Sequence, residues 1–328
     1  MKKVIKRIVV IILILVLIPV LLLSSSTVML TYFPGEKADK TKTDNPYITE
    51  KTLVSAHRSG GEIAPENTLA AFKNCIESNS FNVDIFEFDL HITKDGKLIL
   101  LHDATLDRTT NSEEEFGEKG VRPETKTYDE LRELNFGENF QDQNGNYPYR
   151  GLRGDDIPDD LRALLLEDLL DYLQANGSFG YIIEIKDGNE NGFKATDELY
   201  RILKEKNLLN NVVFGTFNGE VTKYADKHYP DLLRSSGIKE VALFYFAAAF
   251  NIELNKDFYK FEALQIPANQ FVPLHLGSER LVNYAHRHNI AVQYWTINNA
   301  DDVKFLSSIG ADCIMSDNPD MAYDVINK

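Results

Sequence analysis

Two short apolar segments carry charged side chains at alternating positions, a pattern that could support catalysis or metal binding. In IFEFDLHI, Glu87 and Asp89 lie on the face opposite to the apolar side chains, and in YIIEIKDG the same holds for Glu184 and Lys186. In a barrel, the apolar face of a strand contacts the outer helices, so these carboxylates would point inward. Burying them uncompensated would be very costly, whereas oxygen ligands suit Ca²⁺ or Mg²⁺. We therefore predict that the three carboxylates bind a divalent cation. An edge strand with a solvated face is the alternative for either segment alone.

Two histidines follow other predicted strands, His57 after LVSA and His102 after LILL. The Asp-Gly pair at 95–96 is typical of a two-residue hairpin turn, and a turn centred there places His102 opposite Asp89. Two histidines on either side of a carboxylate-bound cation could serve as general acid and general base. The competing interpretation is that each histidine only makes structural hydrogen bonds.

Four further side chains could complete such a site. Arg58 and Lys186 would offer positive charge to an anionic substrate. Glu66, in APENTLAAF, is expected in the first turn of a helix, where an acid complements the macrodipole, and it could support the site from behind. Trp295, in QYWTIN, is either a core residue or an apolar wall for the substrate.

Strand-like and helix-like segments alternate from Leu53 to the C-terminus, which predicts an α/β fold with a parallel sheet covered by helices. Strands are predicted at 53–56, 85–90, 98–101, 181–185, 212–216, 232–235, 263–266, 291–296 and 313–315. The hairpin makes the strand at 98–101 an excursion beside the sheet, so eight parallel strands remain, enough for a TIM (β/α)8 barrel with the inward carboxylates at its mouth. Residues 112–160 form an acidic, glycine-rich insertion.

The N-terminus carries a targeting signal. Residues 8–23 are an uninterrupted apolar run preceded by four basic residues. With the residues up to Tyr32, the run is long enough to cross a bilayer, and its basic flank would stay in the cytoplasm. We therefore predict a transmembrane anchor in residues 1–33, a polar linker in residues 34–51 and an extracytoplasmic catalytic domain in residues 52–328. The alternative is a signal peptide cleaved near Ser24 or Ser26, which would give a secreted protein.

Composition excludes several classes of function. The 328 residues include 35 Lys and Arg against 50 Asp and Glu, a formal net charge of −15. Such an acidic protein would repel a polyphosphate backbone, which argues against general nucleic-acid binding. The two cysteines, Cys75 and Cys313, are too few for a disulfide scaffold or a four-ligand zinc site. No protein partner is evident from the sequence.

Five motifs, in order from Leu53 to the C-terminus, resemble those of the glycerophosphodiester phosphodiesterase family. They are AHRSGGEIAPENTLAAF, EFDLHITKDGKLILLHDATLDRTTN, EIK, WTINN and GADCIMSDNPD. The resemblance implies a TIM barrel of the phospholipase-C-like type that hydrolyses glycerophosphodiesters to glycerol 3-phosphate and an alcohol, using Ca²⁺ or Mg²⁺. By that pattern the acid/base pair is His57 and His102, the metal ligands are Glu87, Asp89 and Glu184, and the phosphate-binding residues are Arg58 and Lys186.

Two departures from the family pattern stand out. Ser59 follows His-Arg where the family usually has Gly, so either the backbone there is ordinary or Gly60 takes the turn. The usual Pro-Thr before the helix near RALLLEDLL is also missing. That change and the insertion bear on substrate fit rather than on the chemistry.

Other functions on the same barrel remain open. Phospholipase-D-like and phosphoinositide-cleaving enzymes act on intact lipid, and a membrane-anchored site could reach a lysophospholipid. A non-catalytic surface-binding barrel would require replacement of a motif histidine or carboxylate, and each is present. No motif places a Ser, Cys or Lys beside a base as a nucleophile, so we expect the attacking oxygen to come from water or from the substrate.

Overall fold

The structure is a computed structural model of the chain. It describes residues 2–255, 259–268 and 274–328, and within these it describes all side chains except those of residues 2–14, 16 and 42. The elements named below belong to that part of the chain.

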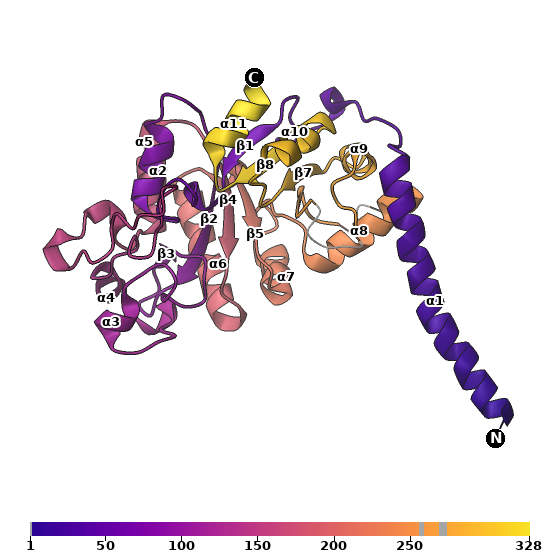
Figure 1. Cartoon of the computed structure of the whole chain (residues 1–328), viewed down its shortest axis with the longest axis horizontal. Coiled ribbons are helices and arrows are strands. Elements are labelled where there is room, and N and C mark those ends of the chain that lie inside the picture. The colour runs from indigo at the N-terminus through magenta and orange to yellow at the C-terminus, as the bar shows by residue number, and fades with distance from the viewer. Residues whose placement is uncertain (1, 256–258, 269–273) are drawn as a thin grey trace.

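Seven parallel strands of the described chain form a nearly closed barrel, in the order β5-β4-β2-β1-β8-β7-β6 (Figure 1). The strands are β1 (Leu53–Ala56), β2 (Ile85–Ile92), β4 (Gly180–Ile185), β5 (Val212–Gly215), β6 (Ala263–Ile266), β7 (Ala291–Tyr294) and β8 (Cys313–Ser316), with β3 (Leu98–Leu100) paired outside the ring. Between β5 and β6, Arg234 bridges to Phe214 and Ser235 to Ala263. The strand predicted at 232–235 thus forms only these two bridges, and they bring the two edges of the sheet together. The predicted TIM-barrel architecture is confirmed at this level.

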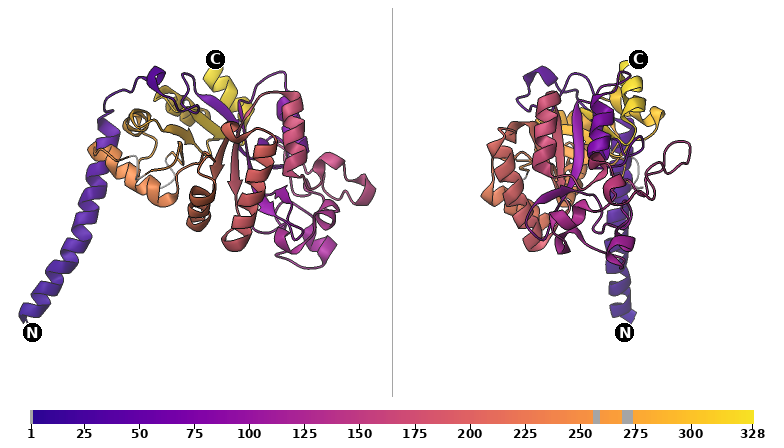
Figure 2. Two further views of the ribbon diagram at one scale, coloured as in Figure 1. Left: turned by 180° about the vertical axis from the view of Figure 1, so that it is seen from behind. Right: turned by 90° about the vertical axis from the view of Figure 1, so that its left-hand side faces the viewer.

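Helices cover the outside of the barrel (Figures 1 and 2). They are α2 (Leu69–Ile76), α5 (Leu166–Asn176), α6 (Asn189–Glu205), α7 (Gly219–His228), α8 (Ile238–Phe250), α9 (Glu279–Arg287), α10 (Ala300–Ser308) and α11 (Pro319–Asn327). The main hydrophobic core lies between these helices and the strands, as where Phe72 of α2 packs on Phe86 and Phe88 of β2. This packing places the apolar face of β2 outward and its acidic face inward, as the residue pattern predicts.

The predicted hairpin register is wrong by one residue. Leu90 pairs with Leu100, and Asp89 lies opposite Leu101, whose backbone N–H donates to the Asp89 carbonyl at 3.1 Å. The hairpin closes through a three-residue loop with Gly96 in the left-handed region (φ +82°) rather than through a two-residue turn. His102 therefore lies one residue beyond the position expected for it, just past the paired part of the hairpin.

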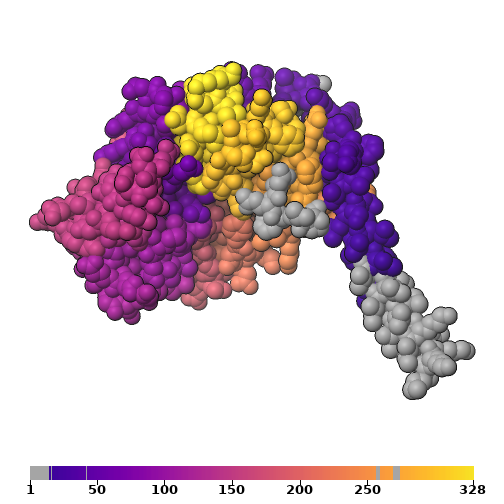
Figure 3. Space-filling view, viewed as in Figure 1, coloured from indigo at the N-terminus to yellow at the C-terminus, as the bar shows by residue number. Residues whose placement is uncertain are grey.

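The insertion is ordered and has a small hydrophobic core of its own. It contains the short helices α3 (Ser112–Phe116) and α4 (Tyr128–Arg132). Its core combines apolar residues of β3 and its flank with those of the insertion: Ile99, Leu101, Leu106, Val121, Tyr128, Leu131, Leu134, Phe136 and Ala163. The insertion forms a lobe at one end of the body, whereas α1 (Lys2–Tyr32) lies at the other end (Figures 1 and 3).

The described C-terminal part of α1 packs on the barrel. Leu30 is buried in the core formed with α8 and α9, and the Ser26 hydroxyl donates to the hydroxyl of Tyr245 on α8 at 3.3 Å. Within the described residues, we find no helix with both the length and the apolarity needed to cross a membrane. The predicted anchor is therefore not supported by the structure, and residues 8–14 and 16 of its apolar run lie outside the described side chains.

The segment predicted as a linker makes several contacts with the N-terminal ends of the barrel strands. The Lys40 ammonium donates to Asp312 at 3.0 Å, and the Asn45 side chain donates to the carbonyls of Glu262 and Asn289. The Tyr47 hydroxyl donates to the carbonyl of Val212 at 2.7 Å. Residues 39–50, called the strap below, therefore lie across the end of the barrel opposite to the strand C-termini.

Candidate active site

Three carboxylates point into the barrel from the middle of β2 and the C-terminal half of β4. Glu184 pairs with Asp89 across the sheet, and Glu87 precedes Asp89 on the same face. Each of the three offers an oxygen within 4.8 Å of the other two. At the other end of these strands the interior cluster is apolar and includes Ile85 and Ile182. The structure thus brings the three predicted metal ligands together at the mouth of the barrel.

This carboxylate cluster gathers three acidic groups in a largely enclosed part of the barrel. Glu87 and Asp89 are only 4% and 1% exposed. Burial and the neighbouring charge of Asp89 raise the pKa of Glu87, and burial raises the pKa of Glu184 although Lys186 opposes the shift. The Lys186 ammonium lies 2.9 Å from Glu184 and 3.4 Å from Asp89. Three closely spaced carboxylates, two of them buried, fit a hard divalent cation, which is held by oxygen ligands.

His57 follows β1 and is fixed by a carboxylate from the end of β8. Its Nδ1 lies 2.6 Å from Asp317 Oδ1, and its Nε2 faces Glu87 at 3.9 Å and the Thr296 hydroxyl at 3.5 Å. Burial alone would lower the pKa of His57, but the charges of Glu87 and Asp317 outweigh it, so the pKa is raised. With Nδ1 occupied by Asp317, Nε2 is the atom available for proton transfer.

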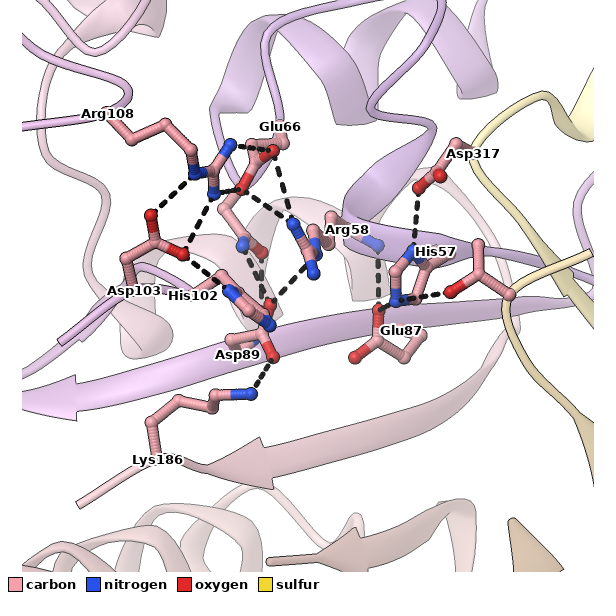
Figure 4. Close-up of polar contacts among 12 residues, drawn as sticks. His57, Arg58, Glu66, Glu87, Asp89, His102, Asp103, Arg108, Lys186 and Asp317 are labelled. Atoms are coloured by element: carbon pink, nitrogen blue, oxygen red, sulfur yellow. Dashed lines mark hydrogen bonds and ion pairs between the residues drawn. The ribbon is translucent and has the colours of Figure 1, made fainter. Parts of the chain in front are cut away.

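His102 has a similar arrangement from the other side of the site. Its Nδ1 lies 2.7 Å from Asp103 Oδ1. Burial and the nearby Lys186 charge lower the pKa of His102, although Asp89 and Asp103 oppose the shift. Figure 4 shows His57 and His102 on opposite sides of the carboxylates of β2. The two predicted acid/base residues therefore flank the predicted metal ligands.

The loop after β1 has a strained backbone that serves the carboxylates. Arg58, Ser59 and Gly60 have φ values of +49°, +65° and +89°. This conformation aims the Arg58 backbone N–H at the Glu87 carboxylate, 2.7 Å away. Asn67, also in the left-handed region, donates from its side chain to Asp89 at 3.0 Å. An ordinary backbone at Ser59 is therefore the wrong alternative, since both Ser59 and Gly60 take left-handed conformations.

Glu66 contacts two arginines instead of capping a helix. Its carboxylate lies 3.4 Å from Arg58 Nη1, and Arg108 donates to it at 2.6 and 2.8 Å (Figure 4). The expected place in a first helical turn is wrong, because α2 begins at Leu69 with Thr68 as its N-cap. Glu66 lies behind the site, as predicted, but its partners are guanidinium groups.

Trp295 follows β7 and stands at the edge of the site. Its indole is half-buried and meets the ring of Phe217 edge-on, with centroids 5.9 Å apart. Phe217 is 58% exposed and its ring centroid lies 5.8 Å from the Lys186 ammonium. The two rings form an apolar wall beside the phosphate-binding lysine predicted from the sequence.

Four functional residues escaped the sequence analysis, namely Asn67, Asp103, Arg108 and Asp317. Each of them lies inside a motif that the resemblance had already picked out: PENT, LLHD, DRTT or MSDNPD. The available signal was therefore the motif itself. Their partners are set by tertiary contacts between separate loops, which no local spacing reveals.

Comparisons with known proteins agree with this geometry. The sequence model of the glycerophosphoryl diester phosphodiesterase family matches residues 57–321. A glycerophosphodiester phosphodiesterase of Caldanaerobacter subterraneus subsp. tengcongensis is 28% identical over 279 residues, which are 85% of this chain and 99% of the relative. One from Bacillus altitudinis is 25% identical over 277 residues, 84% of this chain and 98% of the relative.

Solved structures share the fold at low sequence identity. A putative glycerophosphoryl diester phosphodiesterase from Silicibacter pomeroyi superposes with a TM-score of 0.65 at 18% identity, covering 85% of this chain and 94% of the other. An Oleispira antarctica phosphodiesterase, solved in complex with the product sn-glycerol-3-phosphate, gives a TM-score of 0.61 at 20% identity, covering 85% and 98% of the two chains.

Proposed function

Because the chain belongs to the glycerophosphoryl diester phosphodiesterase family, we propose that this phosphoric diester hydrolase cleaves glycerophosphodiesters to glycerol 3-phosphate and an alcohol by His57/His102 acid–base catalysis at a carboxylate-bound divalent cation. The observation that carries the proposal is the pair of histidine–aspartate contacts on opposite sides of one carboxylate cluster. Asp317 occupies Nδ1 of His57, and Asp103 occupies Nδ1 of His102. Each histidine thus keeps Nε2 for proton transfer.

The cation would be held by Glu87, Asp89 and Glu184. When bound, it would neutralise negative charge on the phosphate and lower the pKa of the attacking hydroxyl. Arg58 and Lys186 stand beside these ligands, with the Arg58 Nε and the Lys186 ammonium 3.9 and 3.4 Å from the Asp89 carboxylate. Both groups are therefore placed to bind the oxygens of a phosphodiester substrate.

The attacking oxygen is the substrate's own hydroxyl next to the phosphate ester. Ser59, two residues after His57 in the sequence, is fully buried and cannot reach a substrate. A neighbouring hydroxyl is already tethered near phosphorus, which avoids most of the entropic cost of a second reactant. One histidine takes its proton while the other protonates the leaving alcohol, and water then opens the cyclic phosphate with the two roles reversed.

The proposal is tested with the full-length protein and a panel of glycerophosphodiesters, with release of glycerol 3-phosphate as the readout. His57→Ala and His102→Ala should each lower kcat by about 10²–10⁴-fold without lowering the melting temperature. His228→Ala is the matched control, because His228 stacks on Tyr224 at the exposed end of α7 and lies outside the site. Retention of full activity in both active-site variants would contradict the assigned roles.

Hydrolysis of a lysophospholipid is the second candidate, and the apolar wall of Phe217 and Trp295 favours it. A largely exposed aromatic ring beside a phosphate-binding lysine could contact an acyl chain. Phe217→Ser should then lower kcat/KM for a lysophospholipid much more than for glycerophosphocholine. Equal effects on the two substrates would remove the support for a lipid substrate.

We also propose that the N-terminal segment directs the catalytic domain out of the cytoplasm, either as a retained anchor or as a cleaved signal peptide. The four basic residues and the apolar run support this, and the described Leu17, Ile18 and Leu21 of α1 are more than half exposed. A retained anchor predicts that the protein stays with membranes after carbonate washing and that added protease reaches the barrel. A mature N-terminus near Thr27 would identify a cleaved signal peptide.

A further inference from the structure

Arg108 makes a double contact with two carboxylates at the edge of the site, and the proposed chemistry assigns it no role. Nη1 and Nη2 donate to the two oxygens of Glu66 at 2.8 and 2.6 Å. Nε and Nη2 donate to the two oxygens of Asp103 at 2.5 and 3.2 Å. The guanidinium thus spans both carboxylates with paired hydrogen bonds, the geometry in which arginine binds carboxylates best (Figure 4).

The two carboxylates lead to two different parts of the active site. Asp103 bonds to Nδ1 of His102 at 2.7 Å, and Glu66 lies 3.4 Å from the Arg58 guanidinium. Resting on the proposed function, we infer that Arg108 is a positioning residue, which fixes the orientation of His102 through Asp103 and that of Arg58 through Glu66. It would act on proton transfer and on phosphate binding without touching the substrate.

His102 needs such support more than its counterpart does. The side chain of His57 is 12% exposed, whereas that of His102, two residues after the end of β3, is 29% exposed. Packing therefore restricts the imidazole of His102 less, and its orientation depends on Asp103. Burial alone would raise the pKa of Asp103, but hydrogen bonds from Arg108 and His102 lower it to about 2. Asp103 therefore stays ionised as the partner of His102.

The insertion holds Arg108 in place. Leu106 donates its backbone N–H to the carbonyl of Val121 at 2.9 Å, and the carboxylate of Asp107 accepts from the backbone N–H of Gly120 at 2.7 Å. Leu106 is also buried in the small core of the insertion. One role of the insertion is therefore to place this arginine against the mouth of the barrel.

The test compares Arg108→Met and Arg108→Lys with the wild-type, full-length enzyme on glycerophosphocholine. Arg108→Met should lower kcat by about 10–100-fold and leave the melting temperature close to that of the wild type. The pH profile of kcat should become narrower, because the limb governed by His102 moves toward the other limb. Arg108→Lys restores the charge but not the paired hydrogen bonds, so kcat should stay at least about tenfold low. Added guanidinium should partly restore the activity of Arg108→Ala.

Arg122→Met is the matched control. Arg122 belongs to the same insertion, but its partner is Glu124, 2.5 Å away, and not a residue of the site. It should leave kcat and KM unchanged. Asp103→Asn combined with Arg108→Met should cost little more than Arg108→Met alone, since Arg108→Met already breaks the contact through Asp103. If Arg108→Met does not fold, Arg108→Lys and the control still decide the question.

Several results would overturn the inference. Full activity of Arg108→Lys would show that charge alone matters. A higher KM at unchanged kcat would show that Arg108 does not orient His102. Arg108→Met with wild-type kcat would refute the positioning role outright. Failure of the proposed function looks different, because His57→Ala and His102→Ala would then retain activity whatever Arg108 does.

Discussion

Asp317 Oδ1 lies 2.6 Å from His57 Nδ1, although the two residues are 260 positions apart in the sequence. The contact exists because β1 and β8 are neighbouring parallel strands, so that His57 and Asp317 both follow strand C-termini at the same edge. Asp317 is held in turn by the side-chain amide of Asn298 at 2.6 Å. Closing the barrel therefore assembles a histidine–aspartate pair from the two ends of the catalytic domain.

Asp317→Asn should lower kcat by about 10²-fold or more, within the range contributed by positioned acid–base groups. Burial lowers the pKa of His57 while the charges of Glu87 and Asp317 raise it. Loss of the Asp317 charge therefore lowers that pKa, and the limb of the kcat/KM profile governed by His57 should move to lower pH. Asp320→Asn, on α11, is the control. An unshifted profile would show that Asp317 does not govern the protonation of His57.

Removal of divalent metal should abolish activity, and Ca²⁺ or Mg²⁺ should restore it and raise the melting temperature. Saturating metal at 100 times its Kd stabilises a protein by about 2.7 kcal/mol. The pKa values of Glu87 and Glu184 are raised by burial above their unfolded values. Metal-free protein should therefore lose stability as pH rises from the unfolded pKa values, about 4.3, through the raised folded values.

Glu87→Gln separates the metal's catalytic role from its structural one. It should inactivate the enzyme, yet leave the metal-free protein as stable as wild type or more stable at pH 7. Burial and the charge of Asp89 disfavour the ionised form of Glu87 and raise its pKa, and the neutral glutamine avoids that cost. Thermal melts with and without chelator measure this. Full activity of wild-type enzyme in excess chelator would be incompatible with the metal site.

The strap should contribute to barrel stability through Lys40. Asp312 is fully buried and accepts from His286 at 2.8 Å. Among the described residues, Lys40 supplies the one ammonium group in contact with it, at 3.0 Å. Lys40→Met should lower the free energy of unfolding by about 1.5–3 kcal/mol, the usual value for a charged hydrogen bond. Lys37→Met should change it by less than about 0.5 kcal/mol, since Lys37 is exposed and lies 3.6 Å from Glu279. Denaturant unfolding of the two variants measures the difference.

Much of the fold could be predicted because its signals are local. Alternation along IFEFDLHI identifies both the inward face of β2 and the two carboxylates on it, since the opposite faces of a strand are fixed by backbone geometry. The hairpin register depends on the turn type, and Asp-Gly fits both a two-residue and a three-residue loop, so the prediction was wrong by one residue. The position of the strap could not be predicted, because its sequence has no periodic pattern. Individual side-chain hydrogen bonds to distant residues hold it in place.

The site likewise contains residues that local patterns predict and residues that only tertiary contacts define. His57, His102 and the three carboxylates follow from strand ends and strand faces, and the structure places them together. Glu66 was expected in the first turn of a helix, but Thr68 is the N-cap of α2, so the helix begins after Glu66. Arg108 and Asp317 depend on loops that meet only after the barrel closes, and for these residues the sequence offers motif membership and no geometry.

Ser59→Gly should stabilise the protein. Ser59 has φ +65°, is fully buried, and its hydroxyl lacks a hydrogen-bond partner among the described residues. Glycine adopts this conformation without the steric cost that a side chain carries, so the free energy of unfolding should rise by up to about 1 kcal/mol. Lys304→Gly, at an exposed position in the middle of α10, should have the opposite sign, because glycine weakens a helix interior. Thermal melts of both variants check the signs, and a destabilised Ser59→Gly would show that the serine side chain stabilises the turn.

Attack from within the substrate predicts a strict requirement for the hydroxyl next to the phosphate ester. A glycerophosphodiester in which that hydroxyl is methylated or deleted should still bind, because the proposed phosphate contacts to Arg58 and Lys186 would remain, but it should not turn over. Competition against glycerophosphocholine measures its binding, and release of the alcohol measures its turnover. The expected loss is large, since a well-aligned internal nucleophile can be worth about 7–11 kcal/mol of barrier. With the normal substrate, a cyclic phosphate should accumulate transiently when water attack is slowed. Hydrolysis of the blocked substrate at a rate comparable to that of the normal one would mean that water attacks directly and that no cyclic intermediate forms.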